Sequence, residues 1–269
     1  MHAAHPSKSH ARRISGLCYG LVVSETVLLV HSGGFTSRQW RKLAERLAPS
    51  YRVIAPDLLG YGDRPRWPAG KPFHFSQDVE LLAGLVTEPA HVVGHSYGGL
   101  LALQLALAHP ELVRSITAYE PVAFGVLAES ELGSVEGLPA YVPDADGVDE
   151  AWLTAFVDWW NGAGSWAALP AETKQAFRAV AWKVSQEVAS LAADRTSRER
   201  YASIAAPTLL LSGGRSPATE QRVIAELAGL LPHATVRTFP ELGHMGPITH
   251  AAIVNAAIEE HVVGLTRQR

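Results

Sequence analysis

Residues 94–98 read Gly-His-Ser-Tyr-Gly and place Ser96 between two glycines. The preceding residues 91–93 have the β-branched character of a short strand, and residues 99–108 strongly favour a helix. A serine on a tight strand-to-helix turn is held in a strained, exposed conformation with its hydroxyl clear of the sheet. Glycines let such a turn close and let the helix approach the strand. The flanking segments, more than the five residues alone, therefore predict that Ser96 is a nucleophile.

A serine hydroxyl is a poor nucleophile near neutral pH, so Ser96 needs a base, an orienting acid and donors for an oxyanion. His244 is the predicted base, because it lies in a glycine-rich loop, 240–246, directly after the last expected strand. Such a loop emerges at the carboxyl end of a parallel sheet, where ligands bind. His95 adjoins Ser96 but should point away from it, and His250 is expected one turn into the closing helix.

Glu120 is the predicted acid. It ends an expected strand, 113–119, and precedes Pro121, which favours an extended conformation at Glu120. Its carboxylate should then lie at the carboxyl edge of the sheet, one strand over from the serine. A rim carboxylate that braces a loop is the structural alternative, and it is less expected at an apolar strand end. Glu220, Asp57 or a dyad without an acid remain open.

The elements that must position these residues alternate between strand-like and helix-like patterns. The apolar run 27–30 is typical of a strand that is buried on both faces. A second strand of this buried kind is expected at 52–55. Further strands are expected at 92–93, 113–119, 208–211 and 235–239, and helices at 37–48, 76–86 with Ser76 as N-cap, 97–108, 217–230 and 247–263. This alternation predicts an α/β fold, a mostly parallel sheet covered by helices on both faces.

One segment interrupts the alternation. Between 121 and 206 no buried-strand run occurs, and loops and two helices are expected, over 149–160 and 170–193. This segment contains most of the tryptophans. They could form its own small core, or line an apolar pocket on the inner face of a lid, and the two interpretations are compatible. The predicted pocket residues are Gly34, Trp152, Trp159, Trp160 and Trp182, and we expect at least two tryptophans of the set that also includes Trp166 to face a pocket above Ser96.

The expected organisation is a disordered tail over 1–13, a core formed by 14–124 and 201–269, and a helical lid over 125–200. With 269 residues, 47% of them hydrophobic, the chain can build a large core. The formal charge of −3 gives no electrostatic case for nucleic acid. The single cysteine, Cys18, fits a reducing compartment and a buried structural role.

No apolar run of signal-peptide or membrane-spanning type is evident, so we expect a cytoplasmic protein that does not contact a membrane. No metal and no organic cofactor is implied, because no cluster of ligating residues and no phosphate-binding loop occurs in the sequence.

At this point the chain resembles the α/β-hydrolase superfamily over nearly all of its length after about residue 25. The similarity rests on residues 31–34, His-Ser-Gly-Gly, on 57–63, Asp-Leu-Leu-Gly-Tyr-Gly-Asp, on the serine turn and on the Gly-His pair at 243–244. The resemblance implies that the oxyanion is held by backbone N–H groups of Gly33 and Tyr97. It also implies that Asp57 braces a loop and stays outside the triad.

The chain departs from the common pattern at the acid. Most members carry an aspartate shortly after the strand equivalent to 208–211, where this chain has Ser216. A serine cannot stabilise an imidazolium by charge. A subset that includes haloalkane dehalogenases places the acid after the preceding strand, which matches the Tyr-Glu-Pro at 119–121. The expected triad is therefore Ser96, His244 and Glu120.

The resemblance implies a carboxylesterase that acts on small to medium apolar esters through an acyl-enzyme. The same triad cleaves C–C bonds of vinylogous diketones in some members, and a cofactor-free peroxidase, a lyase or a non-catalytic receptor are further alternatives. Haloalkane dehalogenases and epoxide hydrolases use an aspartate nucleophile, so Ser96 counts against both. Fold alone does not fix the substrate or the oligomeric state.

Overall fold

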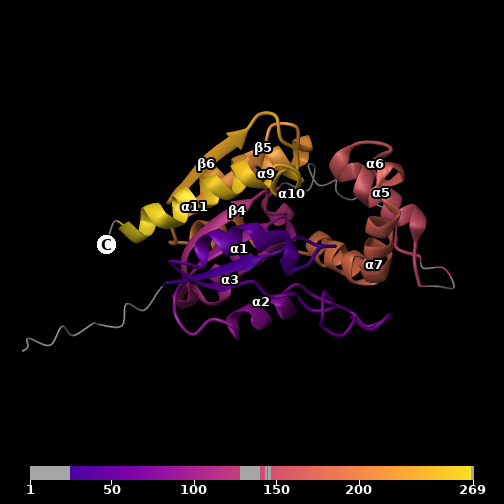
Figure 1. The fold of residues 1–269 in the computed structure, drawn as a ribbon, viewed down its shortest axis with the longest axis horizontal. Coiled ribbons are helices and arrows are strands. Elements are labelled where there is room, and N and C mark those ends of the chain that lie inside the picture. Colours follow the sequence, from indigo (N-terminus) through magenta and orange to yellow (C-terminus); the bar gives the residue numbers. More distant parts are fainter. Residues whose placement is uncertain (1–24, 128–139, 143, 145–146, 268–269) are drawn as a thin grey trace, which may run out of the picture.

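In the described part of the chain, a sheet of six strands, all paired in parallel, forms the centre of the molecule (Figure 1). The computed structural model describes residues 25–127, 140–142, 144 and 147–267. The strand order is β2-β1-β3-β4-β5-β6. The chain adds β2 on one side of β1 and all later strands on the other side, so the strand order reverses between β1 and β3. In open parallel sheets, ligands bind at the carboxyl ends of the strands at such a switch point. The strands are β1 (Thr26–Val30), β2 (Arg52–Ile54), β3 (Ala90–His95), β4 (Val113–Tyr119), β5 (Thr208–Gly213) and β6 (Ala234–Phe239).

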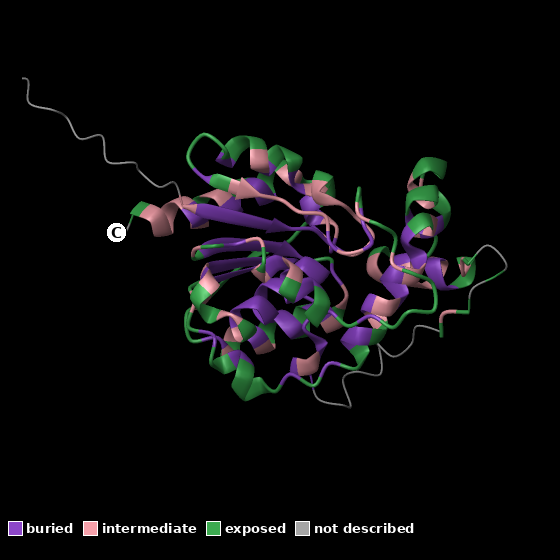
Figure 2. Ribbon diagram, turned by 90° about the horizontal axis from the view of Figure 1, so that it is seen from below, coloured by how far each residue is buried: buried purple, intermediate pink, exposed green. Residues whose placement is uncertain are grey.

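Helices cover both faces of the sheet, as the alternation in the sequence predicts. Leu28 and Val30 of β1 join one buried cluster with α2, α3 and α9, whereas Val27 and Leu29 join another with α1 and α11. The continuous apolar run thus serves two cores, because successive side chains of a strand point to opposite faces. Figure 2 shows buried strands between helices with exposed outer surfaces. These helices are α1 (Arg41–Leu47), α2 (Ser76–Ala83), α3 (Tyr97–Ala108), α9 (Ala218–Leu230) and α11 (Ala251–Arg267), with short turns at η1 (Ser37–Trp40), η2 (Pro110–Leu112) and α10 (Gly246–Thr249).

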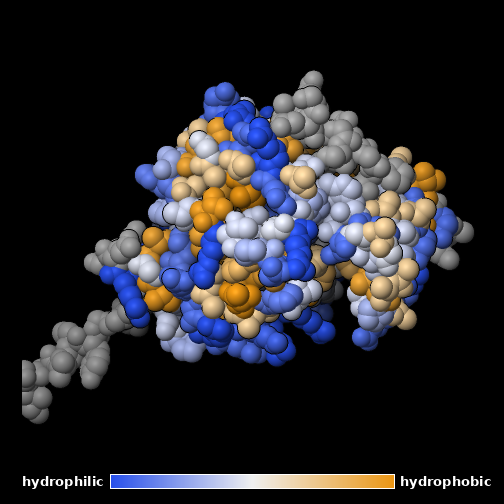
Figure 3. Space-filling view, turned by 90° about the horizontal axis from the view of Figure 1, so that it is seen from above, coloured by the Kyte–Doolittle hydropathy of each residue, from blue (hydrophilic) through white to orange (hydrophobic). Residues whose placement is uncertain are grey.

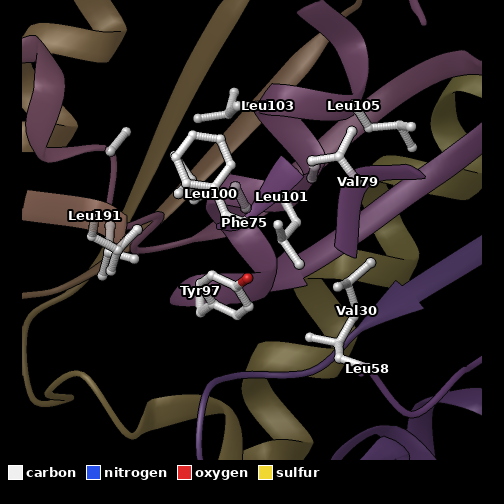
Figure 4. Close-up of a cluster of buried hydrophobic side chains, with 14 of the residues drawn as sticks. Val30, Leu58, Phe75, Val79, Tyr97, Leu100, Leu101, Leu103, Leu105 and Leu191 are labelled. Atoms are coloured by element: carbon white, nitrogen blue, oxygen red, sulfur yellow. The ribbon is translucent and has the colours of Figure 1, made fainter. Parts of the chain in front are cut away.

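Helix α3 is the most deeply buried of these helices, with apolar residues all round. Figure 4 shows Tyr97 and Leu100 of α3 among side chains from other elements, including Val79 of α2 and Leu191 of α7. A helix that follows the serine turn and is buried on every side cannot shift easily. The start of α3, and with it Ser96, is therefore held rigidly.

The segment between β4 and β5, here called the β4–β5 segment, is helical where it is described. It contains η3 (Phe124–Val126), α5 (Glu150–Asn161), α6 (Ser165–Ala168), α7 (Ala171–Ala192) and α8 (Arg198–Ala202). Helices α5, α6 and α7 gather beyond one end of the sheet (Figure 1). Most of the stretch before 149 where loops are expected, the expected tail over 1–13 and Cys18 lie outside the described residues.

Three local expectations are wrong. Strand β2 is only partly buried, because among the described strands it is the last of the sheet and pairs with β1 alone. The N-cap of α2 is Phe75, and the Ser76 hydroxyl instead bonds the ring of His74 at 2.9 Å. The closing helix is broken at His250 (φ −130°), which separates α10 from α11.

The surface seen in Figure 3 mixes hydrophilic and hydrophobic residues. No helix in the described ranges combines the length and the apolar character that crossing a membrane requires. Exposed large hydrophobic side chains in the described part of the chain are Val142, Val236, Ile248 and Ile253.

Candidate active site

Ser96 stands on a strained turn between β3 and α3, with φ 55° and ψ −118°. Positive φ costs a non-glycine residue roughly 1–3 kcal/mol and persists only where the surroundings enforce it. The glycines on either side of Ser96 explain how the surroundings enforce this conformation. A Cβ on Gly94 would collide with the carbonyl oxygen of Gly98, and one on Gly98 would collide with that of Val30. The two glycines thus let strand, turn and helix approach closely enough to fix the serine.

Ser96, His244 and Glu120 form one hydrogen-bonded chain. His244 Nε2 lies 2.9 Å from Ser96 Oγ, and His244 Nδ1 lies 2.7 Å from Glu120 Oε2. All three residues are buried. An ionised carboxylate can only accept, so Nδ1 carries the ring proton and Nε2 is left to accept the serine proton. This is the arrangement that activates a serine hydroxyl.

Glu120 departs from the extended conformation that Pro121 predicts, since its φ is 44°. Its backbone N–H donates to Leu211 O at 2.9 Å, and its Oε1 accepts the N–H of Gly213 at 2.6 Å. These bonds, together with the one to His244, outweigh the local preference that a following proline imposes. Glu120 therefore belongs to the end of β4, while its carboxylate lies at the end of β5.

The loop that carries His244 is held from behind by His95. Gln39 Nε2 donates to His95 Nδ1 at 3.1 Å, so His95 Nε2–H donates to the carbonyl oxygen of His244 at 2.9 Å. Burial lowers the pKa of His95 well below its usual range, which keeps this ring neutral. On the cavity side, the ring of Trp160 stacks on that of His244 with centroids 3.7 Å apart. His95 thus positions the His244 loop and points away from Ser96.

The orientation of the Gly33 N–H follows from the bonds of the preceding carbonyl. Ser32 O accepts His31 Nδ1–H at 2.8 Å and the N–H of Phe35 at 3.2 Å. His31 Nε2 accepts the N–H of Leu58 at 3.0 Å, which fixes this tautomer. Burial lowers the pKa of His31 to about 4. Because a trans peptide is planar, the Gly33 N–H points opposite to the tethered Ser32 carbonyl.

A cavity of about 440 Å³ opens beside these groups, and Gly33, Ser96 and Tyr97 all line it. Tyr97 is the first residue of α3, so its N–H is at the positive end of the helix dipole. An oxyanion bound at this point would meet donors from two elements. Most of the cavity wall is apolar, and it includes Phe35, Val122, Phe124, Phe156, Trp159, Trp160, Leu169, Phe177, Val184, Val188, Leu191, Met245 and Ile248.

Trp159 and Trp160 line this cavity, whereas Gly34, Trp152 and Trp182 do not, and their assignment to the pocket is corrected. Trp152 is buried, stacks on Phe156 with centroids 5.1 Å apart and packs edge-on against Tyr141 at 5.5 Å. Trp182 packs edge-on against Tyr141, and Gly34 is covered by Phe177. These tryptophans therefore hold the shape of the segment, which is the structural alternative raised by the sequence.

Ser216 and the alternative acids make no contact with His244 among the described hydrogen bonds. The Ser216 hydroxyl is buried without a hydrogen-bond partner in the described structure, and so are both carboxyl oxygens of Glu220. Burial, and secondarily the charge of Glu120, raise the pKa of Glu220 well above its ordinary value. Asp57 instead accepts the N–H of Ser37 at 2.7 Å and braces its loop.

Replacement of Glu220 by glutamine is expected to stabilise the protein increasingly as pH rises. The folded state retains a proton on Glu220 that the unfolded chain releases above about pH 4.5, so wild-type stability falls as pH rises through this window. Glutamine does not titrate. The free energy of unfolding of Glu220→Gln, relative to wild type, should therefore be higher at about pH 8 than at about pH 4.5 in urea titrations.

Glu226 provides a matched control on the same helix. Its hydrogen bond with Arg198 lowers its pKa, so its contribution is present above its unfolded pKa and is lost in acid. Glu226→Gln should thus shift in the opposite direction. An identical difference for Glu220→Gln at both pH values would contradict the prediction.

No group of three or more His, Cys, Asp or Glu residues within the described ranges is arranged to hold a metal ion.

The sequence did not point to Glu187, the acidic residue of α7 that lines the cavity. Glu187 forms an ion pair with Lys183, which is four residues earlier on the same helix. Such a spacing usually marks a pair on the exposed face of a helix. Its burial depends on distant residues.

Known proteins share both the sequence pattern and the fold. A dihydrolipoyllysine-residue acetyltransferase component of an acetoin cleaving system from Cupriavidus necator is 30% identical over 265 residues, which cover 90% of this chain and only 64% of the relative. A pimeloyl-(acyl-carrier protein) methyl ester esterase from Neisseria meningitidis serogroup C is 27% identical over 264 residues, covering 89% of this chain and 94% of the relative.

Among solved structures, a meta-cleavage product hydrolase from Pseudomonas fluorescens superimposes with a TM-score of 0.66 at 22% identity and covers 91% of each chain. The model of the alpha/beta hydrolase family matches residues 27–257. With the parallel sheet, the serine turn after β3 and the histidine loop after β6, this match shows that the chain belongs to the alpha/beta hydrolase family.

Proposed function

We propose that this protein is a serine hydrolase of carboxylic esters, with Ser96 as nucleophile, His244 as base and Glu120 as acid. The observation that carries the proposal is the hydrogen-bonded chain from Glu120 through His244 to Ser96, which ends at a largely apolar cavity. The similarity to a methyl ester esterase over 94% of that relative's length supports the choice of an ester.

The geometry supports a two-step reaction. Ser96 Oγ attacks the ester carbonyl while His244 Nε2 takes its proton, and the N–H groups of Gly33 and Tyr97 receive the oxyanion. His244 then donates the proton to the leaving alcohol, which leaves an acyl-enzyme on Ser96. Water, activated by the same nitrogen, hydrolyses the acyl-enzyme. Glu120 orients the ring and stabilises its charged form throughout.

The cavity supports small to medium apolar substrates. Its volume of about 440 Å³ falls within the usual range for small-molecule sites. Glu187 is the only carboxylate among the described residues that line it, so an apolar group is favoured over a charged one. In this proposal the β4–β5 segment acts as a lid, because it contributes the tryptophans and much of the apolar wall.

The test is a series of p-nitrophenyl esters from acetate to dodecanoate, measured on pure protein beside a vinylogous diketone. We expect turnover of the esters with a maximum at short or medium chain length. Turnover of the diketone without turnover of any ester would instead assign C–C bond hydrolysis to the same triad.

Replacement of Trp159 by alanine is expected to move the preference towards longer acyl chains and to raise KM more than it lowers kcat, because Trp159 is part of the apolar wall of the cavity. Trp160→Ala should lower kcat as well, since its ring stacks on His244. Steady-state kinetics over the ester series measure both effects. An unchanged chain-length profile in Trp159→Ala would count against a substrate site in this cavity.

A further inference from the structure

A buried ionic cluster joins helix α7 to the core beneath the oxyanion donors. Lys183 Nζ lies 3.0 Å from Asp78 Oδ2 and 2.7 Å from Glu187 Oε1. The three side chains are at most 3% exposed. Two hydroxyls complete the cluster: Tyr61 donates to Glu187 Oε2 at 2.9 Å, and Tyr97 donates to Asp78 Oδ2 at 2.9 Å.

Each half of the oxyanion site is attached to this cluster. Tyr97, whose backbone N–H is one proposed donor, is tied through its hydroxyl to Asp78. The other donor, Gly33, is followed by Gly34, whose N–H donates to the Tyr61 hydroxyl at 3.1 Å. The Glu187 carboxylate lies so close to Gly33 that a Cβ there would stand 2.7 Å from Oε2. The cluster therefore contacts the loop after β1 and the start of α3 together.

Stability alone does not explain why an ionic cluster, rather than apolar side chains, packs α7 against the core. Burying two carboxylates and one ammonium costs several kcal/mol per ion, and apolar residues of the same volume would often be at least as stable. Surface pairs such as Arg178 with Glu150 already link α7 to α5. What a buried, fully bonded polar cluster provides is a fixed geometry, because each partner is held in one orientation.

From these contacts we propose that Lys183 and Glu187 are positioning residues of the oxyanion site, which hold the Gly33 and Tyr97 donors through Tyr61 and Asp78. Glu187 fixes the Tyr61 hydroxyl that receives the Gly34 N–H, and Lys183 fixes the Asp78 carboxylate that receives the Tyr97 hydroxyl. The inference rests on the proposed function, since it assigns the cluster to that reaction. It also means that the oxyanion site is complete only when α7 is seated on the core.

The experiment compares Lys183→Met and Tyr61→Phe with a matched control, Arg178→Met, which removes a half-buried cation from the same helix. Four quantities are measured for each variant: kcat and KM with a p-nitrophenyl ester, the inhibition constant of a trifluoromethyl ketone, which mimics the tetrahedral oxyanion, and the melting temperature. Lys183→Met leaves two buried carboxylates without a cation and could fail to fold. Tyr61→Phe removes one hydroxyl only and keeps the test decisive.

We expect kcat to fall about 10-fold or more in both cluster variants, because a displaced donor loses its contact with the transition state. KM should stay within about twofold, and the affinity for the trifluoromethyl ketone should fall in parallel with kcat. Arg178→Met should match wild type. A kcat and a ketone affinity within twofold of wild type in Tyr61→Phe, with a lowered melting temperature, would overturn the proposal and leave the cluster as an anchor alone. Failure of the proposed function looks different, since the wild type itself would then turn over no ester.

Discussion

Replacement of Ser96 by alanine should reduce ester turnover by a factor of about 10⁴ or more, while the fold remains intact. Its hydroxyl is the group that His244 Nε2 approaches at 2.9 Å, and no other hydroxyl in the described structure is hydrogen-bonded to that nitrogen. The residual rate should come from the oxyanion donors and substrate binding alone. Steady-state assays and circular dichroism of the pure variant measure both parts of this expectation.

A fluorophosphonate probe provides an independent measurement, because it reacts with activated serines. Ser96 should be labelled in the wild type, and labelling should disappear in Ser96→Ala. Ser185→Ala is a matched control, since Ser185 is a buried serine whose hydroxyl donates to Trp182 O at 2.8 Å. Undiminished turnover in Ser96→Ala would rule out a serine hydrolase mechanism.

Replacement of Glu120 by glutamine should approach the same loss, about 10⁴-fold in kcat. The amide keeps the shape but removes the charge, and an NH₂ group facing His244 Nδ1 favours the wrong imidazole tautomer. The amide oxygen can still accept the Gly213 N–H, so the fold should survive. By contrast, Ser216→Ala should change kcat by less than about twofold, because its hydroxyl has no hydrogen-bond partner among the described residues.

The contrast between these two variants locates the acid. If Glu120→Gln were active and Ser216→Ala inactive, the assignment of the acid to the end of β4 would be wrong, and the loop after β5 would carry the essential residue. The double variant Glu120→Gln with Ser216→Asp extends the test. Partial recovery of kcat would show that the loop after β5 still accepts an acid at the position most family members use.

Much of the fold could be predicted because local signals and tertiary structure agree. The apolar run at Val27–Val30 has no alternation, and the structure buries it on both faces. The contact between Glu120 and His244 could also be anticipated, since both residues follow parallel strands and must meet at one edge of the sheet.

The remaining features depend on distant partners. The positive φ of Glu120 contradicts the preference before proline because Leu211 and Gly213 bond the residue from a neighbouring strand. Lys183 and Glu187 have the spacing of a surface pair, and only the packing of α7 against Asp78 buries them. Trp152 and Trp159 are seven residues apart and share one face of α5, so which of them lines the cavity depends on where along α5 the cavity opens, which the sequence does not indicate.

The non-glycine residues with positive φ in the described part of the chain are Ser96 and Glu120, the proposed nucleophile and acid. Glycine adopts such a conformation freely, so Ser96→Gly would relieve backbone strain at the cost of the reaction. A directed-evolution campaign that selects for heat resistance alone would therefore tend to erode the catalyst first. Any screen for a thermostable form of this protein has to read out turnover in every round.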